Sequence, residues 1–161
     1  MSPVGDLFKN SRVNDLGPLP APRLAPNVTL HQALPFLARG RRGAVVVVET
    51  LRPIGILTER DVLQRLPQGW FATREKRVST PLGEIMSRPP VTVRGKTSLA
   101  EALETMDRLH HRHLVVVSGT GDLKGLLTTN DIVQFLTDQF PEDTLNLPPR
   151  LHQQYRSTEG A

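Results

Sequence analysis

The chain has no cysteine among its 161 residues. This absence excludes disulfide bonds, thiolate catalysis and cysteine-based metal sites. It is compatible with a reducing cytoplasm, where we expect the protein to act. No apolar run approaches the roughly 20 residues that a membrane-spanning helix requires. The first ten residues also lack the apolar core of a signal peptide, so we expect no association with a membrane.

Signatures of catalysis are missing as well. The sequence contains no P-loop, no His-Glu-x-x-His motif and no arrangement of Ser, His and Asp that suggests a nucleophile. His110, His111 and His113 lie close together, but no cysteine or firm carboxylate partner joins them, so we expect no metal site. The Gly119–Gly125 segment resembles part of a dinucleotide fingerprint, but a strand rather than a helix is expected to follow it, which favours a hairpin turn. We therefore predict a protein that is not an enzyme and requires no cofactor.

The charge balance says little about partners. Lys and Arg number 20 against 16 Asp and Glu, and the net charge of +4 is ordinary for a soluble domain. Most of the basic residues are Arg, whose planar guanidinium suits phosphate and carboxylate groups.

What the sequence does contain is an internal repeat. The segments Gly55–Asp61 and Gly125–Asp131 both read Gly-x-x-Thr-x-x-Asp and lie 70 residues apart. Further matches at offsets of 70 and 69 residues pair Ala44–Val47 with Leu114–Val117, Thr29–Leu34 with Ser98–Leu103, and Val13–Leu16 with Leu82–Ile85. A repeat of this period indicates two copies of one unit that bury a shared face.

Each copy reads strand, helix, strand, strand, helix, which predicts an α+β fold. Ser98 and Glu101 have the spacing of a capping box at the start of the second copy's first helix. In the first copy Pro35 falls inside the corresponding helix, and Pro22 weakens the first strand because it lacks an N–H group. We expect a mobile segment at 1–12, repeats at 13–66 and 82–136, a linker at 67–81 and a tail at 137–161, of which most of residues 148–161 should be mobile.

The duplicated order, the Val-rich strands preceded by basic residues and the two Gly-x-x-Thr-x-x-Asp turns resemble a tandem pair of cystathionine-β-synthase (CBS) domains. The segment Leu82–Ser87 is similar to the usual start of such a domain. The chain departs from the family where a Pro often opens the central strand, here Ala44 and Leu114, and where Ser118 replaces an acidic residue. The resemblance covers residues 13–136. It implies a free-standing CBS domain protein whose repeats are related by a pseudo-two-fold axis and which forms a homodimer.

The resemblance also implies a ligand site. It assigns the ribose of an adenosine ligand to Thr58, Asp61, Thr128 and Asp131, its phosphates to Arg41, Arg42, Arg112 and His113, and its adenine to backbone groups of Leu24, Val91 and Val93. The chemistry is reasonable, because a carboxylate can accept both hydrogen bonds of a vicinal diol. We expect the second copy to be the better site, since Pro22 removes a backbone donor from the first.

Two structural alternatives stay open at this point. Thr-x-x-Asp is also a variant of the capping box that simply stabilises a helix start, and the basic loops could be solvated. The predicted function is a regulatory module that binds AMP, ADP or ATP in the cleft between its two repeats, with NAD and S-adenosylmethionine as further candidates, and that signals to an unknown protein partner by a conformational change. The alternative is a protein-interaction or nucleic-acid-binding scaffold with Arg-rich loops, although we do not expect nucleic acid to be the partner.

Overall fold

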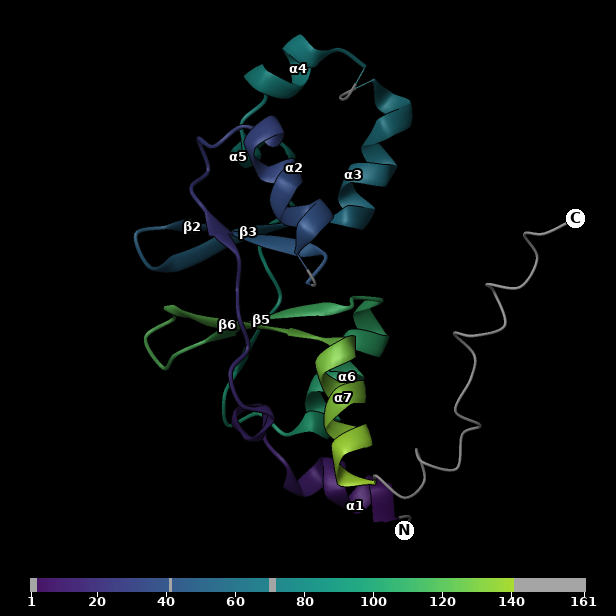
Figure 1. Cartoon of the computed structure of the whole chain (residues 1–161). Coiled ribbons are helices and arrows are strands. Elements are labelled where there is room, and N and C mark those ends of the chain that lie inside the picture. The colour runs from purple at the N-terminus through teal and green to yellow at the C-terminus, as the bar shows by residue number, and fades with distance from the viewer. Residues whose placement is uncertain (1–2, 41, 70–71, 141–161) are drawn as a thin grey trace, which may run out of the picture. The chain divides into compact units, whose positions relative to one another are not determined.

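The computed structural model describes residues 3–40, 42–69 and 72–140. These residues form two three-stranded sheets, with strand orders β1-β2-β3 and β4-β5-β6 (Figure 1). In each sheet the central strand pairs in parallel with the first strand and antiparallel with the third. Helices accompany both sheets, so the predicted α+β class is confirmed.

The predicted order of strand, helix, strand, strand, helix is present in both repeats. The first repeat contains β1 (Arg23–Leu24), α2 (Leu30–Arg39), β2 (Ala44–Glu49), β3 (Arg52–Thr58) and α3 (Glu59–Arg65). The second contains β4 (Thr92–Arg94), α6 (Leu99–Leu109), β5 (His113–Val117), β6 (Leu123–Thr128) and α7 (Thr129–Gln139). The capping box of Ser98 and Glu101 is confirmed, and α2 continues through Pro35, which lies on its exposed side.

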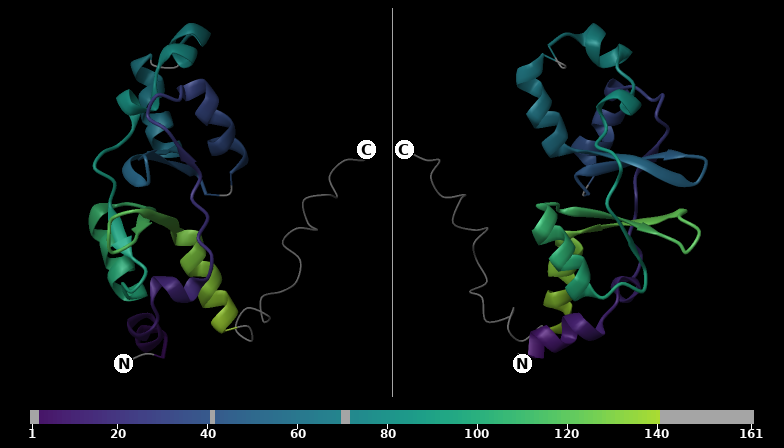
Figure 2. Two further views of the ribbon diagram at one scale, coloured as in Figure 1. Left: turned by 90° about the vertical axis from the view of Figure 1, so that its left-hand side faces the viewer. Right: turned by 180° about the vertical axis from the view of Figure 1, so that it is seen from behind.

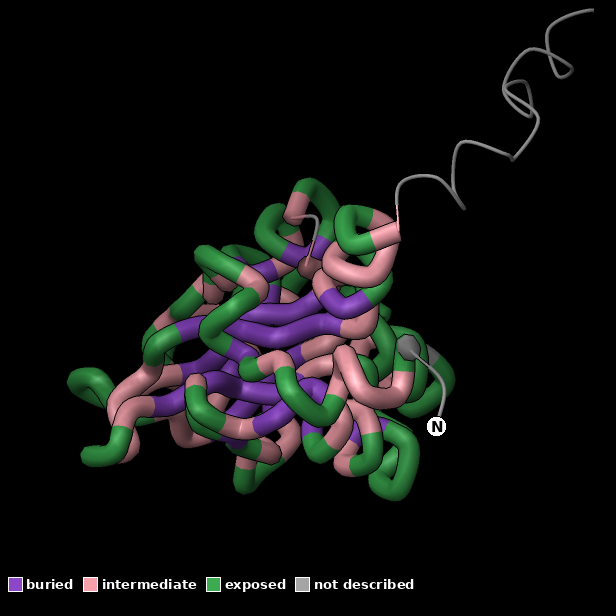
Figure 3. The backbone as a smooth tube through the Cα atoms, turned by 90° about the horizontal axis from the view of Figure 1, so that it is seen from below, coloured by how far each residue is buried: buried purple, intermediate pink, exposed green. Residues whose placement is uncertain are grey.

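The central strands are buried on both faces, which explains their unbroken runs of Val (Figure 3). Val45 and Val47 point into a core shared with α2. Ala44 and Val46 point the other way and pack against residues of the second sheet. The two sheets therefore face each other across an apolar layer, whose buried members are Ala44, Val46, Ile56, Val115, Val117 and Leu126.

The two repeats exchange their leading segments. The helix α5 (Leu82–Ile85) precedes the second sheet in sequence, but its residues belong to the core of the first repeat, where the Leu82 N–H donates to the Val28 carbonyl. Reciprocally, the short 3₁₀ helix at Val13–Leu16 attaches to the start of α6, where the Val13 N–H donates to the Thr97 carbonyl. Each sequence repeat is thus completed by a segment of the other.

Two further helices occupy segments for which the sequence predicted none. Pro3–Asn10, in the segment expected to be mobile, forms α1, which packs against α6 (Figure 2). In the linker, Arg74–Ser79 forms α4, which packs against α2. Both helices are short, and their placement depends on contacts that local sequence does not reveal. The linker residues Trp70 and Phe71 and most of the predicted tail lie outside the described residues.

The chain divides into two compact units, Met1–Thr129 and Asn130–Ala161. Both sheets belong to the first unit, and nearly all of α7 belongs to the second. Within the described residues, each helix is too short or too polar to cross a membrane.

Candidate functional site

The first Gly-x-x-Thr-x-x-Asp motif lies where β3 ends and α3 begins. Asp61 is in the first turn of α3, and only 9% of the residue is exposed. Its Oδ2 accepts hydrogen bonds from the Thr58 backbone N–H at 2.8 Å and from the Thr58 hydroxyl at 2.7 Å. In return, the Asp61 N–H donates to Thr58 Oγ1 at 3.2 Å. The pair therefore forms the helix cap that was the structural alternative for this motif.

The other carboxylate oxygen of Asp61 has two partners that the sequence did not predict. The Ser87 hydroxyl donates to Oδ1 at 2.8 Å, and Arg65 Nη1 lies 3.4 Å from the same oxygen. The i,i+4 spacing on a helix could have identified Arg65, whereas no sequence pattern connects Ser87 with Asp61. Burial by itself raises the pKa of Asp61, but the hydrogen bonds from Thr58 and Ser87 and the charge of Arg65 outweigh it. The pKa lies below its usual value, so the carboxylate is ionised at neutral pH.

The second motif begins its helix in the same backbone setting. Thr128 ends β6 and is 6% exposed, and the half-buried Asp131 lies in the first turn of α7. The N–H of Thr129 donates to the Arg112 carbonyl at 3.1 Å, as that of Glu59 donates to the Gly43 carbonyl at 3.0 Å in the first repeat. The sequence repeat is therefore also a repeat of local structure.

The edge strand beside each motif is bordered by the leading segment of the other repeat. Ser87 and Ile56 exchange two backbone hydrogen bonds, of 3.0 and 2.8 Å, at the edge of the first sheet. At the edge of the second sheet the Leu126 N–H donates to the Leu19 carbonyl at 3.2 Å. The motif glycines permit this approach, because a Cβ atom on Gly125 would lie 2.6 Å from the Leu19 oxygen.

The backbone groups to which the resemblance assigns the adenine take part in the sheets. The Val91 carbonyl accepts a hydrogen bond from the Val115 N–H at 2.9 Å, and the assignment of the adenine to Leu24, Val91 and Val93 stays a prediction. Leu24 and Val93 pair with Val47 and Val116 in their sheets. The stretch that contains Val91 starts at Ser87 and is therefore attached to the motif of the first repeat, although sequence order suggested the motif of the second.

Two of the predicted phosphate ligands contact each other. The Arg42 guanidinium donates to the Leu126 carbonyl, and the Arg42 carbonyl accepts a hydrogen bond from His113 Nε2 at 2.7 Å. Since Arg42 precedes β2 and His113 opens β5, these bonds bridge the two repeats. Arg112 is exposed, and Arg41 lies outside the described residues.

The surroundings of His113 oppose its protonation. Burial is the largest effect and lowers its pKa, whereas the hydrogen bond to the Arg42 carbonyl and the charge of Glu59 raise it. The charges of Arg42 and Arg112 lower it further, and the net pKa lies below the ordinary value. The imidazole is therefore less easily protonated than a solvent-exposed one.

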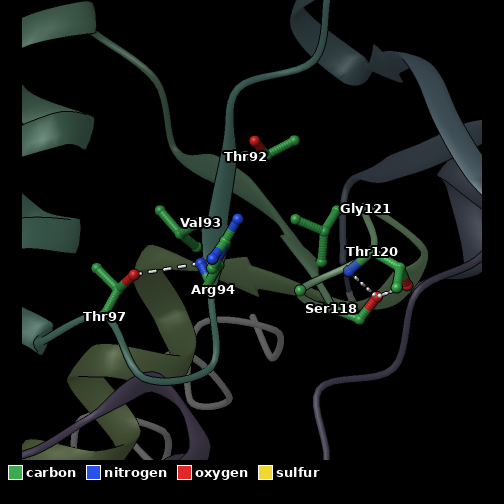
Figure 4. Close-up of a pocket in the computed structure, with 9 residues that line it drawn as sticks. Thr92, Val93, Arg94, Thr97, Ser118, Thr120 and Gly121 are labelled. Carbon is green, nitrogen blue, oxygen red and sulfur yellow. Dashed lines mark hydrogen bonds between the residues drawn. The ribbon is translucent and has the colours of Figure 1, made fainter.

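Two adjoining hollows, of about 480 and 490 Å³, lie beside the turn between β5 and β6. Figure 4 shows residues that line the first of them. The residues common to both are Arg94, Val117, Ser118 and Gly119. The Ser118 hydroxyl accepts hydrogen bonds from the N–H groups of Thr120 and Asp122, so it holds the turn. This turn and Thr128 lie at opposite ends of β6, so the hollows lie away from Thr128, although Val116, which lines one of them, pairs with the motif residue Gly125.

Known proteins with similar sequences and folds support the resemblance seen in the sequence. The CBS domain family matches residues 13–68 and 82–138. A CBS domain protein from Pyrobaculum aerophilum, solved in complex with AMP, is 27% identical with a TM-score of 0.65, covering 79% of this chain and 99% of that one. An uncharacterised 17.7 kDa protein of Acidianus ambivalens is 28% identical over 114 residues, which are 70% of this chain and 65% of that protein.

The chain spans less than two thirds of several curated relatives: 65%, 42% and 45% of three of them. Inosine-5'-monophosphate dehydrogenase of Mycobacterium bovis is 33% identical over 128 residues, which are 78% of this chain but 22% of that enzyme. That similarity is confined to the CBS region of the dehydrogenase. The two family matches, the two small sheets and the duplicated motif agree, and the chain belongs to the CBS domain family as a tandem pair.

Proposed function

We propose that this protein is a non-catalytic regulatory module that binds an adenosine-containing nucleotide at its duplicated motifs. The observation that carries the proposal is the ionised Asp61, which is held with Thr58 at a helix start and recurs in sequence as Asp131 after Thr128. A ribose presents a vicinal diol, and a fixed carboxylate is a strong acceptor for it. The AMP complex of the Pyrobaculum aerophilum relative supports this class of ligand.

Regulation would follow from a shift in population. A ligand favours one arrangement of the repeats, or of a dimer, by as much as its affinity differs between the two states. The bridge from Arg42 to Leu126 and from His113 to Arg42 connects the repeats close to the motifs. A nucleotide phosphate that attracts the Arg42 guanidinium would replace its hydrogen bond to the Leu126 carbonyl with one to the phosphate. Ligand binding would thereby change the contact between the two repeats. A separate protein partner would bind the two arrangements of the repeats with different affinity.

The proposal is tested first with a panel of adenosine, AMP, ADP, ATP, NAD and S-adenosylmethionine. A ligand that binds only the folded protein raises its melting temperature, and calorimetry then gives the affinity and the stoichiometry. Asp131→Ala should weaken binding by about 1.5–3 kcal/mol, because it removes charge-assisted hydrogen bonds. Unchanged affinity in both Asp131→Ala and Asp61→Ala would leave the two motifs as helix caps alone.

Phosphate recognition is tested by the exposed Arg112. If Arg112 binds phosphate, affinity rises from adenosine to AMP, and Arg112→Ala removes that difference while adenosine binding persists. Equal affinity of the wild type for adenosine, AMP and ATP would mean that the basic loops are merely solvated. For the alternative of a nucleic-acid scaffold, the Arg42 guanidinium is already hydrogen-bonded to the Leu126 carbonyl and would have to leave it to reach a nucleic-acid phosphate. A steep salt dependence of nucleic-acid binding would support that alternative.

We also propose that the protein forms a homodimer through its closing helices. On α7 the apolar side chains of Phe135 and Leu136 are half-buried. Leu63 on α3 and Val133 on α7 occupy matching positions of the two repeats and are 64% and 59% exposed. Exposed apolar side chains at equivalent positions suit a self-complementary contact. Sedimentation should show a dimer at micromolar concentration and a shift towards monomer for Leu63→Glu; a strictly monomeric wild type would refute the proposal.

A further inference from the structure

The hydrogen bond between Ser87 and Asp61 joins the first motif to the segment that leads into the second repeat. We propose that Ser87 is a lock on the ribose position of the first repeat: its hydroxyl occupies the carboxylate oxygen that a ligand diol needs, and a ligand binds there only by displacing it. The inference rests on the proposed function and adds a residue that regulates one of its two sites.

The carboxylate of Asp61 is saturated. Its two oxygens offer about four acceptor positions. Thr58 uses two on Oδ2, and Ser87 and Arg65 use the two on Oδ1. A diol therefore has to replace partners that are already in place.

Ser87 is the partner that is least costly to replace. Removing the Thr58 N–H would leave a backbone donor unpaired at a helix start. The Ser87 hydroxyl is half-buried, and by rotation it can donate to water or to the ligand instead. It is also the partner that comes from outside the β3–α3 segment, 26 residues away in sequence. Its displacement would therefore release a tie between the first repeat and the segment leading to β4.

The position of Ser87 does not depend on its hydroxyl. Two backbone hydrogen bonds with Ile56 fix it at the sheet edge, and Met86 beside it belongs to the core of the first repeat. Ser87→Ala should therefore keep the segment in place and remove the competitor alone.

The second repeat provides a natural comparison. Leu19 borders the edge of β6 where Ser87 borders the edge of β3, since their carbonyls accept from Leu126 and Ile56, which are equivalent positions of the repeat. Leu19 has no hydroxyl to donate. The two motifs share their Gly, Thr and Asp but differ in this lock, since Ser87 donates to Asp61 whereas Leu19 offers no hydroxyl. We therefore expect the first repeat to be the weaker site.

The test isolates the first repeat with the Asp131→Ala background and uses adenosine, which has no phosphate. Calorimetry should show that Asp131→Ala/Ser87→Ala binds adenosine about three- to tenfold more tightly than Asp131→Ala, the factor expected from removing one competing hydrogen bond. Adding Ser87→Thr instead restores the hydroxyl and should restore the weaker binding. Ser79→Ala, which removes an exposed hydroxyl on α4, is the matched control and should change nothing.

A readout without ligand separates the lock from a loss of structure. Carboxyl titration by NMR should show a higher pKa of Asp61 in Ser87→Ala, because a hydrogen bond that lowers this pKa is gone. The inference would be overturned if Asp131→Ala/Ser87→Ala bound adenosine no more tightly than Asp131→Ala. It would also be overturned if Asp131→Ala abolished adenosine binding and the added Ser87→Ala did not restore it. A wild type that binds none of the adenosine compounds would instead refute the proposed function, and this inference with it.

Discussion

Gly125→Ala should destabilise the protein, because the leading segment of the first repeat leaves no room for a side chain at this position. A Cβ atom would lie 2.6 Å from the Leu19 carbonyl oxygen and 3.1 Å from the Leu19 Cβ. The oxygen is part of the backbone and accepts the Leu126 N–H, so it cannot move without weakening that bond. Overpacking costs about 1–3 kcal/mol, and a weakened hydrogen bond adds up to about 1 kcal/mol. We expect a loss of about 3 kcal/mol in the free energy of unfolding.

Two other glycines of the chain calibrate this prediction. A Cβ on Gly55 would first meet Met86 Sδ, at 2.3 Å, and then the Ser87 carbonyl oxygen, at 3.0 Å. Since a Met side chain adapts to its surroundings, Gly55→Ala should cost less, about 1–2 kcal/mol. Gly119 has nothing within 4 Å of its Cβ position, so Gly119→Ala should be neutral or slightly stabilising.

Urea unfolding followed by circular dichroism measures all three variants against the wild type. From the most to the least stable, the predicted order is Gly119→Ala, Gly55→Ala and Gly125→Ala. In thermal unfolding of the same variants, each kcal/mol lost should lower the melting temperature by roughly 2–4 °C. A Gly125→Ala protein as stable as the wild type would refute the close approach of Leu19 to β6. Equal losses in Gly125→Ala and Gly119→Ala would show that backbone freedom, rather than space, decides the outcome.

Two further predictions concern pH. The folded pKa of Asp61 is lowered from 3.8, so its contribution to stability is complete above that pH and disappears as the pH falls through the folded pKa. Asp61→Asn should therefore cost about 1–2 kcal/mol at pH 7, and its denaturation midpoint should converge with that of the wild type in acid. The folded pKa of His113 is lowered from 6.5, so wild-type stability should fall as the pH drops from 6.5 towards the folded value. His113→Gln, which does not titrate, should remove this slope; a slope that persists in denaturation midpoints between pH 5 and 7.5 would assign it to other groups.

The sequence by itself determined the repeated architecture. The Gly-x-x-Thr-x-x-Asp motif, the Val runs and the capping box at Ser98 are local patterns, and each predicted the element that the structure contains. The Val runs carry the most information, because a strand buried on both faces needs apolar residues at successive positions. The short helices α1 and α4 escaped detection, since contacts with α6 and α2 accompany them and their own sequences are weak signals.

The tertiary structure decided what surrounds each motif. Chain order suggests that each repeat completes itself, but the leading segments are exchanged, so that Ser87 reaches Asp61 and Leu19 reaches the edge beside Gly125. Nothing in the sequence distinguishes a free Asp61 from a saturated one, or an Arg42 that faces solvent from one that spans two repeats. Hydrophobic periodicity records which face of an element is buried, and it holds no information on which distant segment covers that face. The exchange is a property of the packed pair, and the difference between the two candidate sites follows from it.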